Sequence, residues 1–484
     1  MIVHLVDGTY ELFRHFYGLR RFSKGNDRPV SDGGFANTPS KAPFQALNLP
    51  LAGLRIVTTR PPLNWFGGVD FDFATEMAEE LRALGAAVFE LDTRGFIFPN
   101  RDYIKAITQE LRSFRPDVAM SLPNATYALL CCSGQGNIFA DILQIPVIML
   151  WDHGLLQWPR WCLYPLPEKP AQSTPGSIQK LREALNHPLY HHYSPDSGHM
   201  MAFDRLGVLS RDKIKMFLQP AYPNFVKHGY RVVDRSAFRA RVAFAGNVYL
   251  QASQELPFRD EPVLTEIEER VLARKQERLT DSLWDLITAE IDQLNRPIRE
   301  QLRLGPDCTF FWRFVHDEIE VVGNTRARLA VLGGLTREYD FFGNFIEPKS
   351  ADTLRSHYNI RLRKSLDYFT ELPLLFINSD VIVDIVNLGY NSGISPKIMG
   401  CLACGGLILF DYKEDFHRAL GDVGNQVMYR TIDELNGLVD LYLSNGRRRH
   451  DVSRYIQYQI ETKYSFGKLC QRILVEEPVW QGVG

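Results

Sequence analysis

The residues from 390 to 415, YNSGISPKIMGCLACGGLILFDYKED, have the types and spacing with the clearest chemical meaning in the chain. Ser395 is expected to be the N-cap of a helix and Pro396 its first residue. The backbone N–H groups of residues 393 to 397 would then be free and would point the same way, which together with the helix dipole makes an anion cradle for nucleotide phosphates. Lys397 could add a full positive charge. The pattern also fits a capped helix that is simply docked on a sheet.

The elements around this loop follow an alternation of strands and helices, which predicts two α/β halves with parallel, doubly wound sheets. In the first half, apolar runs at 54–59, 87–91, 117–121 and 146–151 alternate with helical patterns. The second half opens with the strand and Gly-Asn turn RVAFAGNV at 241–248. We expect an N-terminal appendage and linker at 1–51, one Rossmann-like domain at 52–230, a second at 231–475 with a charged helical insertion at about 255–310, and a tail at 476–484.

Composition permits a large folded enzyme and excludes several other classes of protein. The chain has 484 residues, 45% of them hydrophobic, and a formal net charge of −2, which argues against a general nucleic-acid surface. No apolar run is long enough for a membrane span and no secretion signal begins the chain, so we expect a cytoplasmic protein, with peripheral membrane association left open. The seven cysteines are scattered, which fits reduced thiols, and the Cys401/Cys404 pair has no second pair to complete a metal site.

The motif at 402–412 resembles one family, the spore-maturation-protein type of group 1 glycosyltransferases. Its LACGG helix end matches residues 402 to 406, its strand matches 407 to 410, and Asp411 and Tyr412 follow, with further similarity through YSF at 464–466. The resemblance implies the GT-B architecture, in which two Rossmann-like domains face a central cleft, and transfer of a sugar from a nucleotide-diphosphate donor. This chain departs from the family where two glutamates steady the donor sugar, because it has Ser392 and Gly400 there.

Open α/β sheets bind ligands outside the carboxyl ends of their strands, so two facing domains would place both sets of loops on one cleft. On the C-terminal side we expect the donor to be bound by glycine-containing loops, whose backbone can approach a ligand closely, and by one cation. The expected donor-binding residues are Gly246, Asn247, Gly343, Asn344, Gly393, Ile394, Ser395 and Lys397. A second basic cluster, Arg361, Arg363 and Lys364, could instead be a solvated face. The only small molecule expected is the nucleotide-diphosphate sugar, with no cofactor and no metal.

On the N-terminal side two loops carry candidate residues. Gly67, Gly68 and Asp70 follow the first strand, where a GT-B enzyme needs flexible backbone near the sugar and acceptor, although a tight turn explains the glycines as well. Asp152 and His153 follow the strand at 146–151 and are the expected catalytic pair, because histidine titrates near neutrality and could take the proton of an acceptor hydroxyl. A buried histidine bonded to a carbonyl is the alternative. His199 is a second candidate of the same kind.

Three functions remain open from the sequence. The leading one is a metal-independent glycosyltransferase whose acceptor is a glycan, a lipid-linked glycan, a protein or a small molecule, and whose stereochemistry is undetermined. The second is a protein that kept the fold and binds nucleotide-sugar or glycan without turnover, because both family glutamates are missing. The third is a metal-dependent nuclease, because residues 1–22 resemble the start of bacterial 5′-3′ exonucleases and Asp7 would be a metal ligand.

Overall fold

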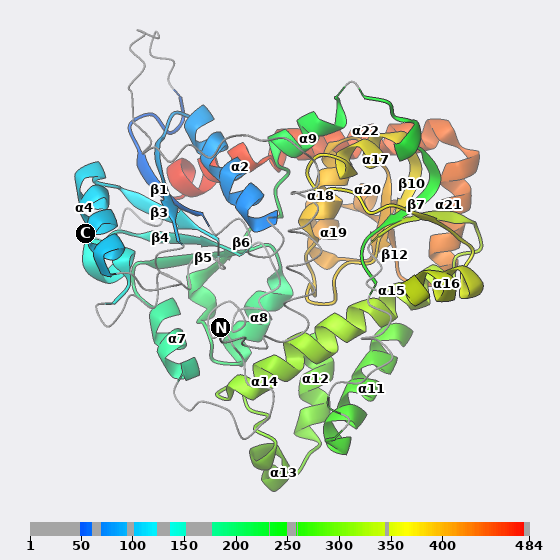
Figure 1. Cartoon of the computed structure of the whole chain (residues 1–484), viewed down its shortest axis with the longest axis horizontal. Helices are drawn as coiled ribbons and strands as arrows, with labels where there is room; N and C mark the ends of the chain where they lie inside the picture. Colours follow the sequence, from blue (N-terminus) through cyan, green and yellow to red (C-terminus); the bar gives the residue numbers. More distant parts are fainter. Residues whose placement is uncertain are drawn as a thin grey trace, which may run out of the picture.

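Two six-stranded parallel sheets form the centres of two α/β domains, which lie side by side (Figure 1). The computed structural model describes residues 49–60, 69–93, 101–122, 136–151, 177–231, 233–248, 258, 260–343 and 348–478. The predicted fold class, two Rossmann-like doubly wound domains, is confirmed by these sheets. The predictions for residues 1–48, including Asp7, concern residues outside those that the structure describes.

The N-terminal domain has the strand order β2-β1-β3-β4-β5-β6, and every neighbouring pair is parallel. β3 and β4 are buried along their whole length, because their apolar residues are covered on both faces of the sheet. The strands are β1 (Arg55–Arg60), β2 (Ala87–Asp92), β3 (Val118–Ser121), β4 (Val147–Leu150), β5 (Tyr190–Ser194) and β6 (Ile214–Met216). The main helices are α2 (Val69–Ala83), α4 (Arg101–Phe114), the π-helix η2 (Ile138–Leu143), α7 (Ser177–Leu185) and α8 (Ser197–Arg205).

The C-terminal domain has the strand order β12-β11-β10-β7-β8-β9, again parallel throughout. Its strands are β7 (Ala240–Ala245), β8 (Tyr339–Phe342), β9 (Ile360–Arg363), β10 (Ser379–Val383), β11 (Ile408–Asp411) and β12 (Met428–Tyr429). Its helices after β8 are α16 (Pro348–His357), α17 (Leu372–Asn378), α18 (Pro396–Ala403), α19 (Glu414–Leu420), α20 (Asp422–Asn425), α21 (Ile432–Ser444) and α22 (Gly446–Lys463).

A helical layer is inserted between β7 and β8, where the sequence predicts a charged insertion. It contains α11 (Pro262–Glu277), α12 (Leu283–Asp292), α13 (Arg296–Gln301), α14 (Thr309–Arg313), the π-helix η7 (Phe314–Val322) and α15 (Gly323–Gly333). These helices bury a large apolar side, including Trp284, Phe310 and Trp312. Ion pairs of Arg182 with Asp307 and of Arg205 with Asp285 join the layer to the N-terminal domain. The layer lies below both domains in Figure 1 and contacts each of them.

Two crossings of the chain fasten the domains to each other. α9 (Pro223–Gly229) leads into the C-terminal domain and packs on α17 and α18. After α22 the chain returns through α23 (Phe466–Gln471) and the π-helix η8 (Arg472–Glu476), drawn in red, to pack on α2 (Figure 1). The return is pinned by a backbone bridge between Ala221 and Ser465. None of the helices in the described part of the chain combines the length and the apolar character needed for a membrane span.

Candidate functional site

The loop before α18 has the local structure that its sequence predicts. Ser395 is the N-cap, with extended backbone, and Pro396 begins the helix. The Ser395 hydroxyl does not cap α18. Its oxygen is buried and has no hydrogen-bond partner among the described residues. The backbone N–H groups of Gly393 and Ile394 likewise have no partner within the described ranges. The loop therefore holds several hydrogen-bond donors that no residue in the described part of the chain uses.

Beside this loop, Lys397 is paired with a carboxylate that the sequence analysis overlooked. Its Nζ lies 2.6 Å from Asp384 Oδ1, just after β10, and donates to the Ala245 carbonyl at 2.9 Å, at the end of β7. The second oxygen, Asp384 Oδ2, is buried without a partner in the described chain. An acid directly after an apolar strand was the signal that could have identified Asp384, because such positions lie at the carboxyl edge of the sheet.

A second cation reaches the same place from the helical layer. Arg328 of α15 donates from Nη1 to the Asn247 carbonyl at 2.8 Å, while its Nε is buried and has no partner among the residues described. Its charge acts on both Asp384 and Lys397. The carboxyl ends of β7 and β10 thus carry two cations and one anion, so the group as a whole favours a further negative charge. Sequence reasoning missed Arg328 because it lies on a separate helix, after the predicted insertion and far from the motif along the chain.

Burial determines the titration of this group. Desolvation raises the pKa of Asp384, and the charge and hydrogen bond of Lys397 oppose that shift. Desolvation also lowers the pKa of Lys397, and Asp384 opposes that shift in turn. Charges in so poorly solvated a place interact strongly with any ion that enters, because little water is present to screen them.

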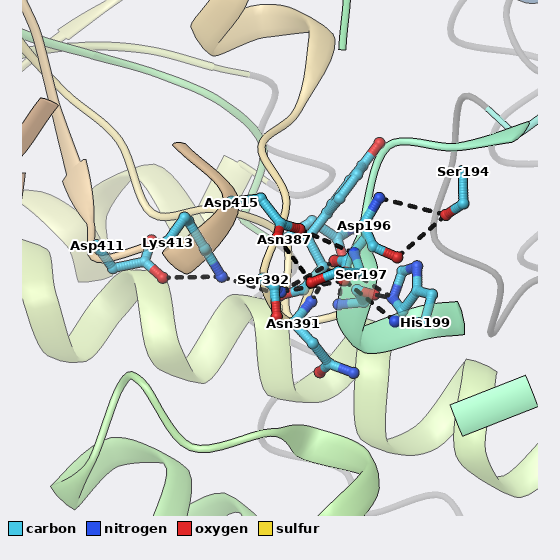
Figure 2. Close-up of polar contacts among 12 residues, drawn as sticks. Ser194, Asp196, Ser197, His199, Asn387, Asn391, Ser392, Asp411, Lys413 and Asp415 are labelled. Atoms are coloured by element: carbon cyan, nitrogen blue, oxygen red, sulfur yellow. Dashed lines mark hydrogen bonds and ion pairs between the residues drawn. The ribbon is translucent and has the colours of Figure 1, made fainter. Parts of the chain in front are cut away.

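The N-terminal domain touches the loop through Asp196, the N-cap of α8 (Figure 2). Its carboxylate is fully buried and accepts hydrogen bonds from the N–H groups of Asn391 at 2.7 Å and Ser392 at 3.1 Å. Beside it, Ser197 donates from its N–H and its hydroxyl to Asp415 at 2.8 and 2.7 Å. A carboxylate from one domain therefore accepts from two N–H groups of the loop in the other domain. The next two N–H groups, those of Gly393 and Ile394, are the ones without a partner among the described residues.

Two glycines make this contact close. A Cβ at Gly198 would lie 2.7 Å from the Cβ of Asn391, and a Cβ at Gly393 would collide with the Pro195 carbonyl. The predicted donor-loop residue Gly393 thus has a second role in the contact between domains. Lys413 supports the loop from the other side, where its Nζ donates to the Tyr390 carbonyl at 2.9 Å and pairs with Asp411 at 3.1 Å.

His199 lies at this contact, but it is held by protein groups. Its side chain is completely buried, its Nε2 is bonded to the Gly389 carbonyl, and the same nitrogen lies 3.7 Å from Asp196 Oδ2. Figure 2 shows the imidazole beside Asp196 rather than aimed away from the contact. The arrangement matches the alternative weighed for such histidines, a buried imidazole bonded to a backbone carbonyl.

The position of the missing family glutamate at Gly400 is filled by a neighbouring ring. A Cβ on Gly400 would lie 2.6 Å from the edge of Phe225, which comes from α9. Phe225 packs on Tyr368 and Phe369, and the same two rings contact Phe73 of the N-terminal domain, so the four rings form an aromatic cluster between the two domains. A glutamate would not fit at position 400 without displacing this packing. At position 392 the Ser392 N–H donates to the carboxylate of Asp196.

The remaining predicted donor residues lie at the same edge of the sheet. Gly246 donates its N–H to the Phe342 carbonyl at 3.0 Å, and a Cβ at Gly343 would collide with the Gly246 carbonyl, so the two loops need this glycine to pack. Together with Asn247 they bring the predicted loops of β7 and β8 beside α18. Asn344, Gly67, Gly68, Asp152 and His153 lie outside the described residues, and of Asp70 only the backbone, at the start of α2, is described.

Two other predicted clusters have structural partners of their own. Arg361 and Arg363 lie on the edge strand β9, not on a helix, and pair with the buried Asp340 of β8 at 3.0 and 2.6 Å. Cys401 and Cys404 are buried in α18, and burial raises the pKa of Cys404 to about 12, so the thiols stay protonated. Among the described residues, no three His, Cys, Asp or Glu side chains are grouped to hold a metal ion.

No protein-family model and no curated protein matches the sequence. Among solved structures, a glycosyltransferase from Rickettsia africae is similar with a TM-score of 0.47 and 10% sequence identity, and the match covers 89% of this chain and 98% of the other. T4 phage BGT in complex with its UDP-glucose substrate is similar with a TM-score of 0.42 and 10% identity, over 87% of this chain and 99% of the other. The catalytic domain of starch synthase IV from Arabidopsis thaliana, bound to ADP and acarbose, is similar with a TM-score of 0.44 and 11% identity, over 89% of this chain and 99% of the other. At these values no residue role is taken from them.

Proposed function

We propose that this protein is a glycosyltransferase that binds the diphosphate of a nucleotide sugar at the loop before α18. The observation that carries the proposal is the set of unused donors there: the N–H groups of Gly393 and Ile394, the Ser395 hydroxyl, and the Nε of Arg328. A diphosphate would satisfy all of them, and buried donors without partners are costly to a fold unless they serve a ligand.

The two cations would act on the leaving group without a metal ion. When the acceptor hydroxyl attacks the anomeric carbon, the bond between that carbon and the phosphate oxygen breaks, and the electron pair stays on the nucleotide diphosphate. Arg328 and Lys397 lie where they can offset this growing negative charge. The acceptor oxygen loses its proton to a base, and Asp152 and His153 remain our candidates for it. The acceptor itself is a glycan, a lipid-linked glycan or a protein in this proposal.

A binding protein without turnover is the second candidate, and two observations favour it. Gly400 has no room for the family glutamate, and the carboxylate of Asp196, which accepts from the Ser392 N–H, is held in the contact between domains. Both candidates require nucleotide binding at α18, and only the first requires release of nucleotide from a sugar donor.

The test is Arg328→Met, with Arg326→Met on the same helix as its matched control. Arg326 faces another direction and pairs with Glu269 at 2.8 Å. We expect Arg328→Met to weaken binding of a nucleoside diphosphate at least about tenfold in calorimetry, because one charge-assisted contact is lost, and Arg326→Met to leave it unchanged. Equal affinities for both variants would refute the site. Nucleotide binding without release from UDP-, GDP- or ADP-sugars would favour the binding protein.

A further inference from the structure

A basic groove lies at the opposite edge of the C-terminal sheet from the loop that begins α18. It encloses about 750 Å³ beside the amino ends of β7, β10 and β11, and the start of α22 forms one wall. Its charged lining consists of Arg235, Arg239, Arg449, His450 and a single carboxylate, Asp380. Three guanidiniums against one carboxylate give the lining a net charge of +2, although the whole chain carries −2. The groove therefore favours anions, although the net charge of the chain is slightly negative.

The arginines divide into one that is fixed and two that are available. Arg449 donates to the Tyr442 carbonyl at 2.9 Å and pairs with Asp380 at 2.8 Å, which holds its guanidinium at the wall and neutralises the carboxylate. Arg239 is exposed, and its side chain makes no hydrogen bond or ion pair with any residue that the structure describes. Arg235 donates only to the Arg231 carbonyl, at 3.3 Å. Two guanidiniums thus keep most of their donors for a ligand.

A buried hydroxyl adds a hydrogen-bonding group to the floor of the groove. Ser379 Oγ, at the start of β10, is buried and has no partner among the described residues, although it lines the groove. Guanidinium groups with an adjacent hydroxyl form a typical phosphate-binding set, because the planar fork of arginine matches two phosphate oxygens. A carboxylate ligand would use the same fork, but it gains less from several cations at once because it carries a single charge.

Exposed tyrosines lie on the elements that form the groove. Tyr230 and Val233 precede Arg235 in the chain, Tyr455 and Tyr458 follow His450 on α22, and all four are more than 40% exposed. The Gln457 amide donates to the Tyr230 hydroxyl at 3.3 Å, which brings the two segments together. Tyrosine beside arginine suits the boundary between water and lipid headgroups, so the phosphate could belong to a lipid or to a soluble ester.

We propose that this groove is a second binding site, specific for a phosphate-bearing ligand and independent of the sugar-nucleotide site. The test uses inorganic pyrophosphate and vesicles of phosphatidylcholine with or without phosphatidylglycerol. Arg235→Ala/Arg239→Ala removes the two available guanidiniums. Arg355→Ala removes a similarly exposed arginine from α16 and serves as the control. We expect the double variant to lose at least about tenfold in affinity for one of the two probes, and the control to lose none.

A variant of the exposed tyrosines distinguishes a lipid phosphate from the phosphate of a soluble ligand. If the ligand is a lipid, Tyr455→Ser/Tyr458→Ser weakens vesicle binding and leaves pyrophosphate binding unchanged. If the ligand is soluble, pyrophosphate binds, added salt weakens it, and the tyrosine variant has no effect. Absence of binding by the wild type to both probes, or equal binding by the wild type and the arginine double variant, would overturn the proposal. If Arg328→Met loses binding of the sugar-nucleotide donor but still binds pyrophosphate at the groove, the two sites are independent of each other.

Discussion

Two neighbouring residues of opposite charge, Asp384 and Lys397, form a largely buried ion pair in the candidate site. Their side chains are only 2% and 18% exposed. Burying such a pair costs desolvation energy that an apolar pair of the same size would not, so the pair is poorly explained by stability alone. Its place at the carboxyl ends of β7 and β10 gives it a use, since Lys397 keeps a positive charge next to the free donors of the loop.

At this scale we expect stability and binding to respond differently to removal of the pair. Lys397→Met should lower the free energy of unfolding by about 3–5 kcal/mol, because Asp384 is left buried without its partner. Lys397→Met/Asp384→Leu should recover most of that loss, because no unpaired charge remains, but it should not recover nucleoside diphosphate binding. Urea unfolding and calorimetry measure the two quantities. Full binding by the double variant would show that Lys397 has no part in the site.

The start and type of a single element were easier to predict from the sequence than the contacts that its residues make with other elements. The N-cap Ser395 and Pro396 placed the start of α18 correctly, because capping is decided by neighbouring residues. The partners of Lys397 could not be predicted, because Asp384 and Arg328 are brought to it by separate strands and helices. The same limit applies to Gly400, which is required by the ring of Phe225 on a distant helix.

Among the elements, α11 holds an acid that should make stability depend on pH. Glu268 is fully buried against the helical layer, both of its oxygens lack partners in the described chain, and burial raises its pKa to about 7 from 4.5. Between these values the folded state keeps a proton that the unfolded state has released. The contribution of Glu268 to the free energy of unfolding is therefore fully present below about pH 4.5. It is lost as the pH rises to about 7, and it does not return above that pH.

Glu268→Gln should flatten this dependence, because glutamine does not titrate. We expect the wild type to lose on the order of 3 kcal/mol more than the variant between about pH 4.5 and 7, since one pKa unit corresponds to about 1.4 kcal/mol. Urea unfolding at several pH values measures the difference, and subtraction of the two curves removes the contribution of Glu76, whose pKa burial also raises to about 7. Parallel curves would mean that Glu268 is solvated in the folded protein.

At the scale of the whole molecule, the two domains meet through the loop that is proposed to hold the donor. Asp196 accepts from Asn391 and Ser392 across the boundary, and Ser197 reaches Asp415 (Figure 2). The helical layer and the returning helix α23 also join the domains, so loss of Asp196 should loosen the contact without separating them. One continuous stretch of backbone then serves both purposes. Asn391 and Ser392 make the contact with the other domain, and the proposed ligand binds at Gly393 and Ile394.

Asp196→Ala should therefore change both the radius of gyration of the protein and its affinity for nucleoside diphosphate. Three N–H groups lose their acceptor, those of Asn391, Ser392 and His199, so we expect the free energy of unfolding to fall by about 1–3 kcal/mol and the radius of gyration in solution scattering to rise. Nucleoside diphosphate should bind more weakly, because it must order the loop that Asp196 now holds, and at saturation it should restore the wild-type radius.

Asp204→Ala on the outer end of α8 is the control, since among the described residues the Asp204 side chain bonds only within its own domain, to the Arg211 N–H. Tighter binding by Asp196→Ala would mean instead that repulsion between this carboxylate and the phosphates outweighs its ordering of the loop, and that the closed contact opposes donor binding.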